Sequence, residues 1–101
     1  MSYDVYLWAL RKDLREQSIS ARHGEISLFE RLVQVNRENE QFITDAERGH
    51  LQEEDSVSSA LRLGWAKFRL HTYKDLVHQA MRRKTVDNQQ VIKIACELYK
   101  L

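Results

Sequence analysis

Residues 56–84 read SVSSALRLGWAKFRLHTYKDLVHQAMRRK, and this stretch decides the fold. It contains one glycine and no proline, and two apolar sets recur through it at the helical spacing of three and four residues. The first set is Val57, Ala60, Leu61, Gly64, Trp65 and Phe68. The second set is Leu63, Ala66, Leu70, Tyr73, Val77 and Ala80. A helix with apolar residues on two sides is usually enclosed by neighbours, so the pattern predicts one long central helix over residues 56–84.

The charges at the two ends of this stretch suit the dipole of a helix. Acids precede it and bases close it: Glu53, Glu54 and Asp55, then Arg82, Arg83 and Lys84. Asp55 or Ser56 is the predicted N-cap. Each such charge stabilises a helix by roughly 0.3–1 kcal/mol. The terminal bases therefore have a structural explanation before any ligand is considered.

The second half of the predicted central helix carries a polar strip that we expect to face water: His71, Lys74, Asp75, His78 and Arg82. Within it, His71, Asp75 and His78 are spaced to project from one face, and imidazole with carboxylate can bind zinc. Neither a zinc-finger spacing nor HExxH is present. The favoured interpretation is a solvated face, and we predict no metal and no cofactor.

Length and composition indicate one small helical domain over residues 1–101. The chain is 43% hydrophobic and 31% charged, with three glycines and no proline, which favours a few helices joined by short loops. The predicted fold class is all-α, with about four helices in a compact bundle around residues 56–84. No apolar run approaches the length that crosses a bilayer, so no membrane partner is expected. A single cysteine and no basic N-terminal region predict an intracellular, cytoplasmic protein.

Before the central stretch, the sequence predicts two helices and a short helical turn. Residues 3–16 read as a helix in preference to a strand, because Ala9–Glu16 are strong helix formers. Residues 17–24, with two serines and Gly24, are the predicted break. Residues 25–42 form the second predicted helix, and the capping-box spacing from Thr44 to Glu47 indicates a separate turn.

After the central stretch, residues 88–100 are the last predicted helix. Asp87 and Gln90 have the spacing of a capping box, and apolar residues follow at helical spacing. Cys96 lies in this helix, and we expect it to be a small buried or half-buried residue rather than a reactive thiol.

Charge divides the chain into two opposite regions. Residues 37–56 carry a net charge of −5, and residues 60–84 carry +6, although the whole chain carries only +1. A chain of this kind can pair its own halves, or it can present a patch of one sign to a partner.

Catalytic motifs are missing from the sequence. It contains no GxSxG, no CxxC and no Walker loop, and its three glycines are isolated from one another. We therefore expect a protein that is not an enzyme.

Two binding functions are left. The leading hypothesis is a small regulator or adaptor that binds a larger protein partner, because the chain is rich in amphipathic helix and in the Tyr, Trp and Arg residues that dominate interfaces. The alternative is nucleic-acid binding, because bases alternate with aromatic residues along the central helix. A domain pI of about 7.9 is low for that alternative. A homodimer through the Leu63–Ala80 set is also possible. The candidate binding residues are Arg62, Lys67, Arg69, Lys74, Arg82, Arg83 and Lys84.

Overall fold

A computed structural model describes residues 3–49 and 56–101 of the chain. Its described residues form four α-helices and no strand: α1 (Tyr3–His23), α2 (Leu28–Glu47), α3 (Ser56–Arg82) and α4 (Asn88–Tyr99). The predicted all-α fold class with four helices is confirmed.

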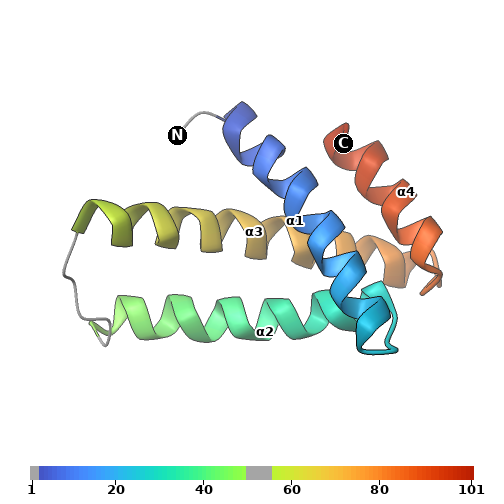
Figure 1. The fold of residues 1–101 in the computed structure, drawn as a ribbon, viewed down its shortest axis with the longest axis horizontal. Coiled ribbons are helices and arrows are strands. Elements are labelled where there is room, and N and C mark those ends of the chain that lie inside the picture. Colours follow the sequence, from blue (N-terminus) through green and yellow to red (C-terminus); the bar gives the residue numbers. More distant parts are fainter. Residues whose placement is uncertain (1–2, 50–55) are drawn as a thin grey trace.

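The helices α2 and α3 run antiparallel, side by side, and α1 and α4 lie across them (Figure 1). The helix α3 contacts each of the other three, as predicted for a central helix. The helix α2 does the same, so the centre of the fold is the α2–α3 pair rather than α3 alone. The helices α1 and α4 make little direct contact with each other.

Side chains from all four helices meet in one core. Its fully buried members are Leu10 and Leu14 of α1, Leu28, Leu32 and Val35 of α2, Tyr73, Leu76 and Ala80 of α3, and Val91, Ile94 and Ala95 of α4. Burying each of the larger side chains contributes roughly 1.5–3 kcal/mol. Leu76 belonged to neither predicted apolar set, because the adjacent Val77 was assigned to that turn, whereas Leu76 is the buried residue and Val77 is half-buried.

The two apolar sets of α3 have different surroundings. In the second set Ala66, Tyr73 and Ala80 are buried within the monomer. Leu63, Leu70 and Val77 of the same set are half-buried, so the homodimer through the Leu63–Ala80 set stays a prediction. The first set is exposed at its start, at Val57 and Leu61.

Further along the first set, α1 covers α3 with aromatic rings. Tyr6 stacks on Phe68 with the ring centroids 4.8 Å apart, and it also stacks on Trp65. A Cβ atom on Gly64 would lie 2.9 Å from the Tyr6 hydroxyl, so this glycine lets α1 approach closely. The middle of α3 is therefore enclosed on both sides, as predicted.

The predicted break at residues 17–24 is wrong, because α1 continues to His23. The Ser18 hydroxyl donates to the Leu14 carbonyl at 3.0 Å, a bond that a helix interior accommodates. The helix ends where Ile26 N donates to the Ala21 carbonyl and Glu25 N to the Arg22 carbonyl, which is a Schellman motif. Glu25, and not Gly24, has the positive φ of this turn, at 56°.

The bounds of the second predicted helix also need correction. It begins at Leu28, not at residue 25, because the Ser27 hydroxyl caps it by accepting from Glu30 N at 3.1 Å. It continues without interruption to Glu47, so the break after residue 42 and the separate turn at Thr44 are wrong. Asn36 and Asn39, which weaken a helix intrinsically, are buried, and Asn39 accepts a hydrogen bond from Arg69 of α3, so packing outweighs propensity here.

The ends of the last two helices are close to those predicted. The helix α3 ends at Arg82, two residues before the predicted bound, in a second Schellman motif with Lys84 at a φ of 53°. Asp87 caps α4 by accepting from Gln90 N at 3.0 Å, which confirms the predicted cap. The acids at 53–55 and the side chain of Ser56 lie outside the described residues, so the N-cap of α3 stays a prediction. Across the described ranges, no helix combines the length and apolarity that a membrane span requires.

Candidate functional site

The candidate bases of α3 are mostly engaged within the molecule. Lys67 pairs with Glu47 at 3.6 Å and Lys74 with Glu40 at 3.4 Å, both across the α2–α3 contact. The guanidinium of Arg62 lies over the ring of Phe42, 5.2 Å from its centroid. The acidic and basic regions of the sequence thus pair with each other here, which was one of the two predicted outcomes.

Arg69 points into the fold and ties three helices together. Its guanidinium donates to the carboxylate of Asp13 on α1 at 3.1 Å and to the amide oxygen of Asn39 on α2 at 2.9 Å. The side chains of Arg69 and Asp13 are only 21% and 12% exposed. Arg69 therefore holds α1 on the α2–α3 pair and offers little surface to a partner.

The hydroxyl of Tyr73 completes this network by donating to the second oxygen of Asp13, at 2.6 Å. Burial, and then the adjacent Asp13 carboxylate, raise the pKa of Tyr73 well above its ordinary value of 10. Tyr73 thus stays protonated and donating over the physiological range.

The remaining candidate bases cluster where α3 ends. Arg83 pairs with Glu97 of α4 at 3.0 Å, while Arg82 and Lys84 are exposed. Together with the pairs above, this placement spreads the seven candidates along the whole of α3. The structure does not bring them together into one site.

A different surface, between α1 and α4, is open and apolar. Three neighbouring cavities, of about 440, 390 and 350 Å³, lie there and share lining residues. Arg11 and Leu101 line the first and second cavities, and Ser18, Arg22 and Ile92 line the second and third. We call this continuous surface the α1–α4 groove.

Large apolar side chains line the α1–α4 groove and stay accessible. Ile19 of α1 is 38% exposed, and Ile92 and Leu98 of α4 are 37% and 38% exposed. Leu14 and Leu101 lie deeper. A groove with an apolar floor and open apolar edges suits a binding partner more than it suits water.

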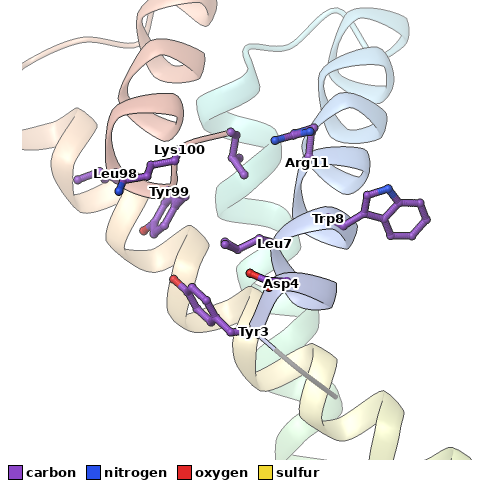
Figure 2. Close-up of a pocket in the computed structure, with 9 residues that line it drawn as sticks. Tyr3, Asp4, Leu7, Trp8, Arg11, Leu98, Tyr99 and Lys100 are labelled. Atoms are coloured by element: carbon purple, nitrogen blue, oxygen red, sulfur yellow. The ribbon is translucent and has the colours of Figure 1, made fainter.

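Figure 2 shows the end of the groove nearest the start of α1. Leu7 and Arg11 point from α1 toward α4, and Tyr3 and Tyr99 point toward one another. The indole of Trp8 points away from α4, on the other side of α1, where Lys12 lies 5.5 Å from its ring centroid. The first cavity is therefore bordered by aromatic rings and by bases.

Tyr99 fixes the α4 wall of the groove on α3. Its hydroxyl donates to the carboxylate of Asp75 at 2.7 Å, and the Thr72 carbonyl oxygen lies 3.1 Å from the same hydroxyl. Burial, followed by the hydrogen bond to Asp75, raises the pKa of Tyr99 above its ordinary value. Asp75 is thus half-buried and bonded, so the prediction that it faces water with His71 and His78 is wrong.

Cys96 faces the groove, and its predicted burial is also wrong. It is exposed on the groove side of α4, because Ile94 and Ala95 take the buried positions of that turn. No cluster of three or more His, Cys, Asp or Glu side chains suited to a metal occurs among residues 3–49 and 56–101.

A row of arginines borders the groove, and none of these residues was among the predicted candidates. Arg11, Arg15 and Arg22 of α1 all line the second cavity, alongside Ser18. Their spacing of four and seven residues places them on one face of a helix. The signal was present, but a helix predicted to stop at residue 16 left Arg22 outside it.

No protein-family model, curated protein or solved structure matches this chain.

Proposed function

We propose that the protein is a non-enzymatic adaptor or regulator that binds a larger protein partner, and that the partner docks in the α1–α4 groove. The observation that carries the proposal is the row of accessible apolar side chains over three joined cavities. Interfaces between proteins have an apolar centre with a polar rim, and arginine and aromatic residues are enriched in them. The groove has an apolar floor bordered by Arg11, Arg15 and Trp8. We propose a cytoplasmic location as well, which is supported by the single cysteine of the chain, since one cysteine cannot form an internal disulfide.

The arginines of the groove favour a protein segment over a wholly apolar ligand. Arginines on one edge and isoleucines on the floor suit a segment that is apolar on one side and polar on the next. Nucleic-acid binding is less well supported by the structure than by the sequence, since four of the candidate bases are paired with acids of this chain: Lys67, Arg69, Lys74 and Arg83.

Matched substitutions test the groove. Ile19→Glu and Ile92→Glu each place a carboxylate among the accessible apolar side chains of the groove, and Leu61→Glu makes the same change at an exposed position of α3 outside it. A tagged chain is used to capture partners from nuclease-treated lysate of its source cells, read by mass spectrometry. We expect one stoichiometric protein with the native chain and Leu61→Glu, and its loss with both groove variants.

Three results would contradict the proposal. Capture that is indifferent to both groove substitutions places the interface elsewhere. Capture of nucleic acid, with protein lost after nuclease, favours the nucleic-acid alternative. Absence of any stoichiometric protein removes the adaptor function. Circular dichroism and thermal unfolding of each variant show that a lost partner reflects the surface rather than the fold.

A further inference from the structure

We infer that the segment bound in the α1–α4 groove is an amphipathic α-helix with acidic residues along one edge. The inference rests on the proposed function and deepens it, because it states the chemistry of the partner. It follows from the net positive charge of the groove, from the lack of ion pairs to its arginines within the described residues, and from the spacing of those arginines.

Bases outnumber acids in the groove. Its basic lining residues are Arg11, Arg15, Arg22 and Lys100, and its acidic one is Asp4, at one end. The middle and the far end contain no acid at all among their lining residues. An occupant that carries acids is therefore attracted along most of the groove, whereas a basic one is repelled.

The arginines of the groove lack partners of opposite charge within the described chain. The ion pairs of residues 3–49 and 56–101 use Lys67, Arg69, Lys74 and Arg83, and none uses an arginine of the groove. Like charges four residues apart, such as Arg11 and Arg15, destabilise a helix slightly. No ion pair within residues 3–49 and 56–101 offsets that cost, and only Arg22 has a favourable position relative to the helix dipole, in the last turn of α1.

The spacing of the row fits a helix. From Arg11 to Arg22, α1 rises about 16 Å at roughly 1.5 Å per residue, which is three turns. A helix lying along α1 repeats its own side chains at the same interval, so acids at every fourth or third position face these arginines in turn. Both walls of the groove are helices, and no strand edge is available in the described residues for an added strand.

The floor of the groove requires that the same helix be apolar on the adjoining face. Leu14, Ile19 and Ile92 lie beside the arginine row, so a helix with acids on one edge would place its neighbouring stripe on them. A phosphate backbone would satisfy the arginines but would leave these side chains without an apolar contact. The floor therefore favours a protein helix over a nucleic acid.

Three synthetic helical peptides test the inference against the native chain. All three have 14 residues and the same leucine stripe, and the residues flanking that stripe are glutamate, glutamine or lysine. We expect the glutamate peptide to bind on the order of tenfold more tightly than the glutamine peptide, since three exposed ion pairs are at stake, and the lysine peptide to bind most weakly. The advantage of glutamate should shrink as salt is raised.

Charge reversal provides a readout that an unfolded protein cannot give. The triple variant R11E/R15E/R22E should reverse the order and prefer the lysine peptide. A matched variant with Arg82, Arg83 and Lys84 changed to Glu should keep the native order. Cys96, the single cysteine, reports occupancy of the groove, because the glutamate peptide should slow its alkylation in the native chain.

Other outcomes overturn the inference and leave the proposed function to its own test. Equal affinity for the glutamate and glutamine peptides, or no binding of any peptide, removes the acidic edge even if partner capture still depends on Ile19. Displacement of the glutamate peptide by a single-stranded oligonucleotide assigns the arginines to phosphate. A doubled mass in solution that Ile19→Glu restores to a monomer assigns the groove to a second copy of the chain.

Discussion

Two rows of bases run along this protein, one on α3 and one on α1, and they differ in what lies opposite them. The row on α3 faces acids of the other three helices: Asp13, Glu40, Glu47 and Glu97. The row on α1 faces the open groove, and none of the ion pairs in the described residues includes it. The α3 row is the denser one in the sequence, yet the α1 row is the one available to a partner. A cluster of bases in the sequence is available to a partner only where no acid of the folded chain pairs with it.

The largest expected difference between the rows is in stability. We expect Arg69→Ala to lower the free energy of unfolding by about 2–4 kcal/mol, because it leaves the half-buried Asp13 and the buried Asn39 without this partner. Arg15→Ala should change it by less than about 0.5 kcal/mol, because that side chain is exposed. Urea unfolding followed by circular dichroism measures both. Equal effects would mean that the two rows are equivalent and that the network around Asp13 is not structural.

A smaller effect is expected from Tyr73, which also donates to Asp13. Tyr73→Phe should lower stability by about 1–2 kcal/mol at neutral pH, because it removes one hydrogen bond to a carboxylate. The raised pKa of Tyr73 adds a pH dependence. The unfolded chain loses this proton near pH 10 and the folded chain does not, so the contribution is fully present below pH 10 and is lost as the pH rises above it.

Unfolding measured at several pH values above 9 tests that dependence. The stability of Tyr73→Phe should fall less steeply with pH than that of the native chain. Tyr99, whose pKa is also raised, contributes in the same direction, so a variant with both tyrosines changed should show the shallowest slope. Identical slopes in the native chain and Tyr73→Phe would contradict the assignment.

The smallest effects are expected from the exposed pairs of the α3 row. Lys67→Ala and Lys74→Ala should each change stability by less than about 0.5 kcal/mol, because both partners in each pair are more than half exposed. Repeating the unfolding in 1 M salt should abolish even that difference. A loss larger than about 1 kcal/mol would show that pairing on this surface stabilises the fold as pairing inside it does.

The sequence predicted best those features that depend on neighbours along the chain. The cap at Asp87 and the long helix through Trp65 and Tyr73 follow from spacings of three and four residues, and the structure contains both. Predictions failed where local preference and packing disagree. Asn39 weakens a helix by itself, but within α2 it accepts from Arg69, so the helix continues past it.

The residues of the candidate site were harder to predict from the sequence than the helices, because their exposure and partners depend on how the helices pack. Exposure of Cys96 could not be deduced from its place in an apolar helix, because Ile94 and Ala95 compete for the same core. The engagement of Arg69 could not be deduced either, since Asp13 is 56 residues away in sequence.

By itself, the sequence determined that the chain forms helices, roughly where these begin and end, and which of their residues are apolar. Helical periodicity and capping act over a few neighbouring residues, so the sequence contains this information. Only the tertiary structure decided which charges are paired and which are free. That outcome depends on how α1 and α4 cross the α2–α3 pair, because contacts between residues distant in sequence set it. The crossing places Asp13 against Arg69, and it leaves Arg11, Arg15 and Arg22 beside an open apolar groove.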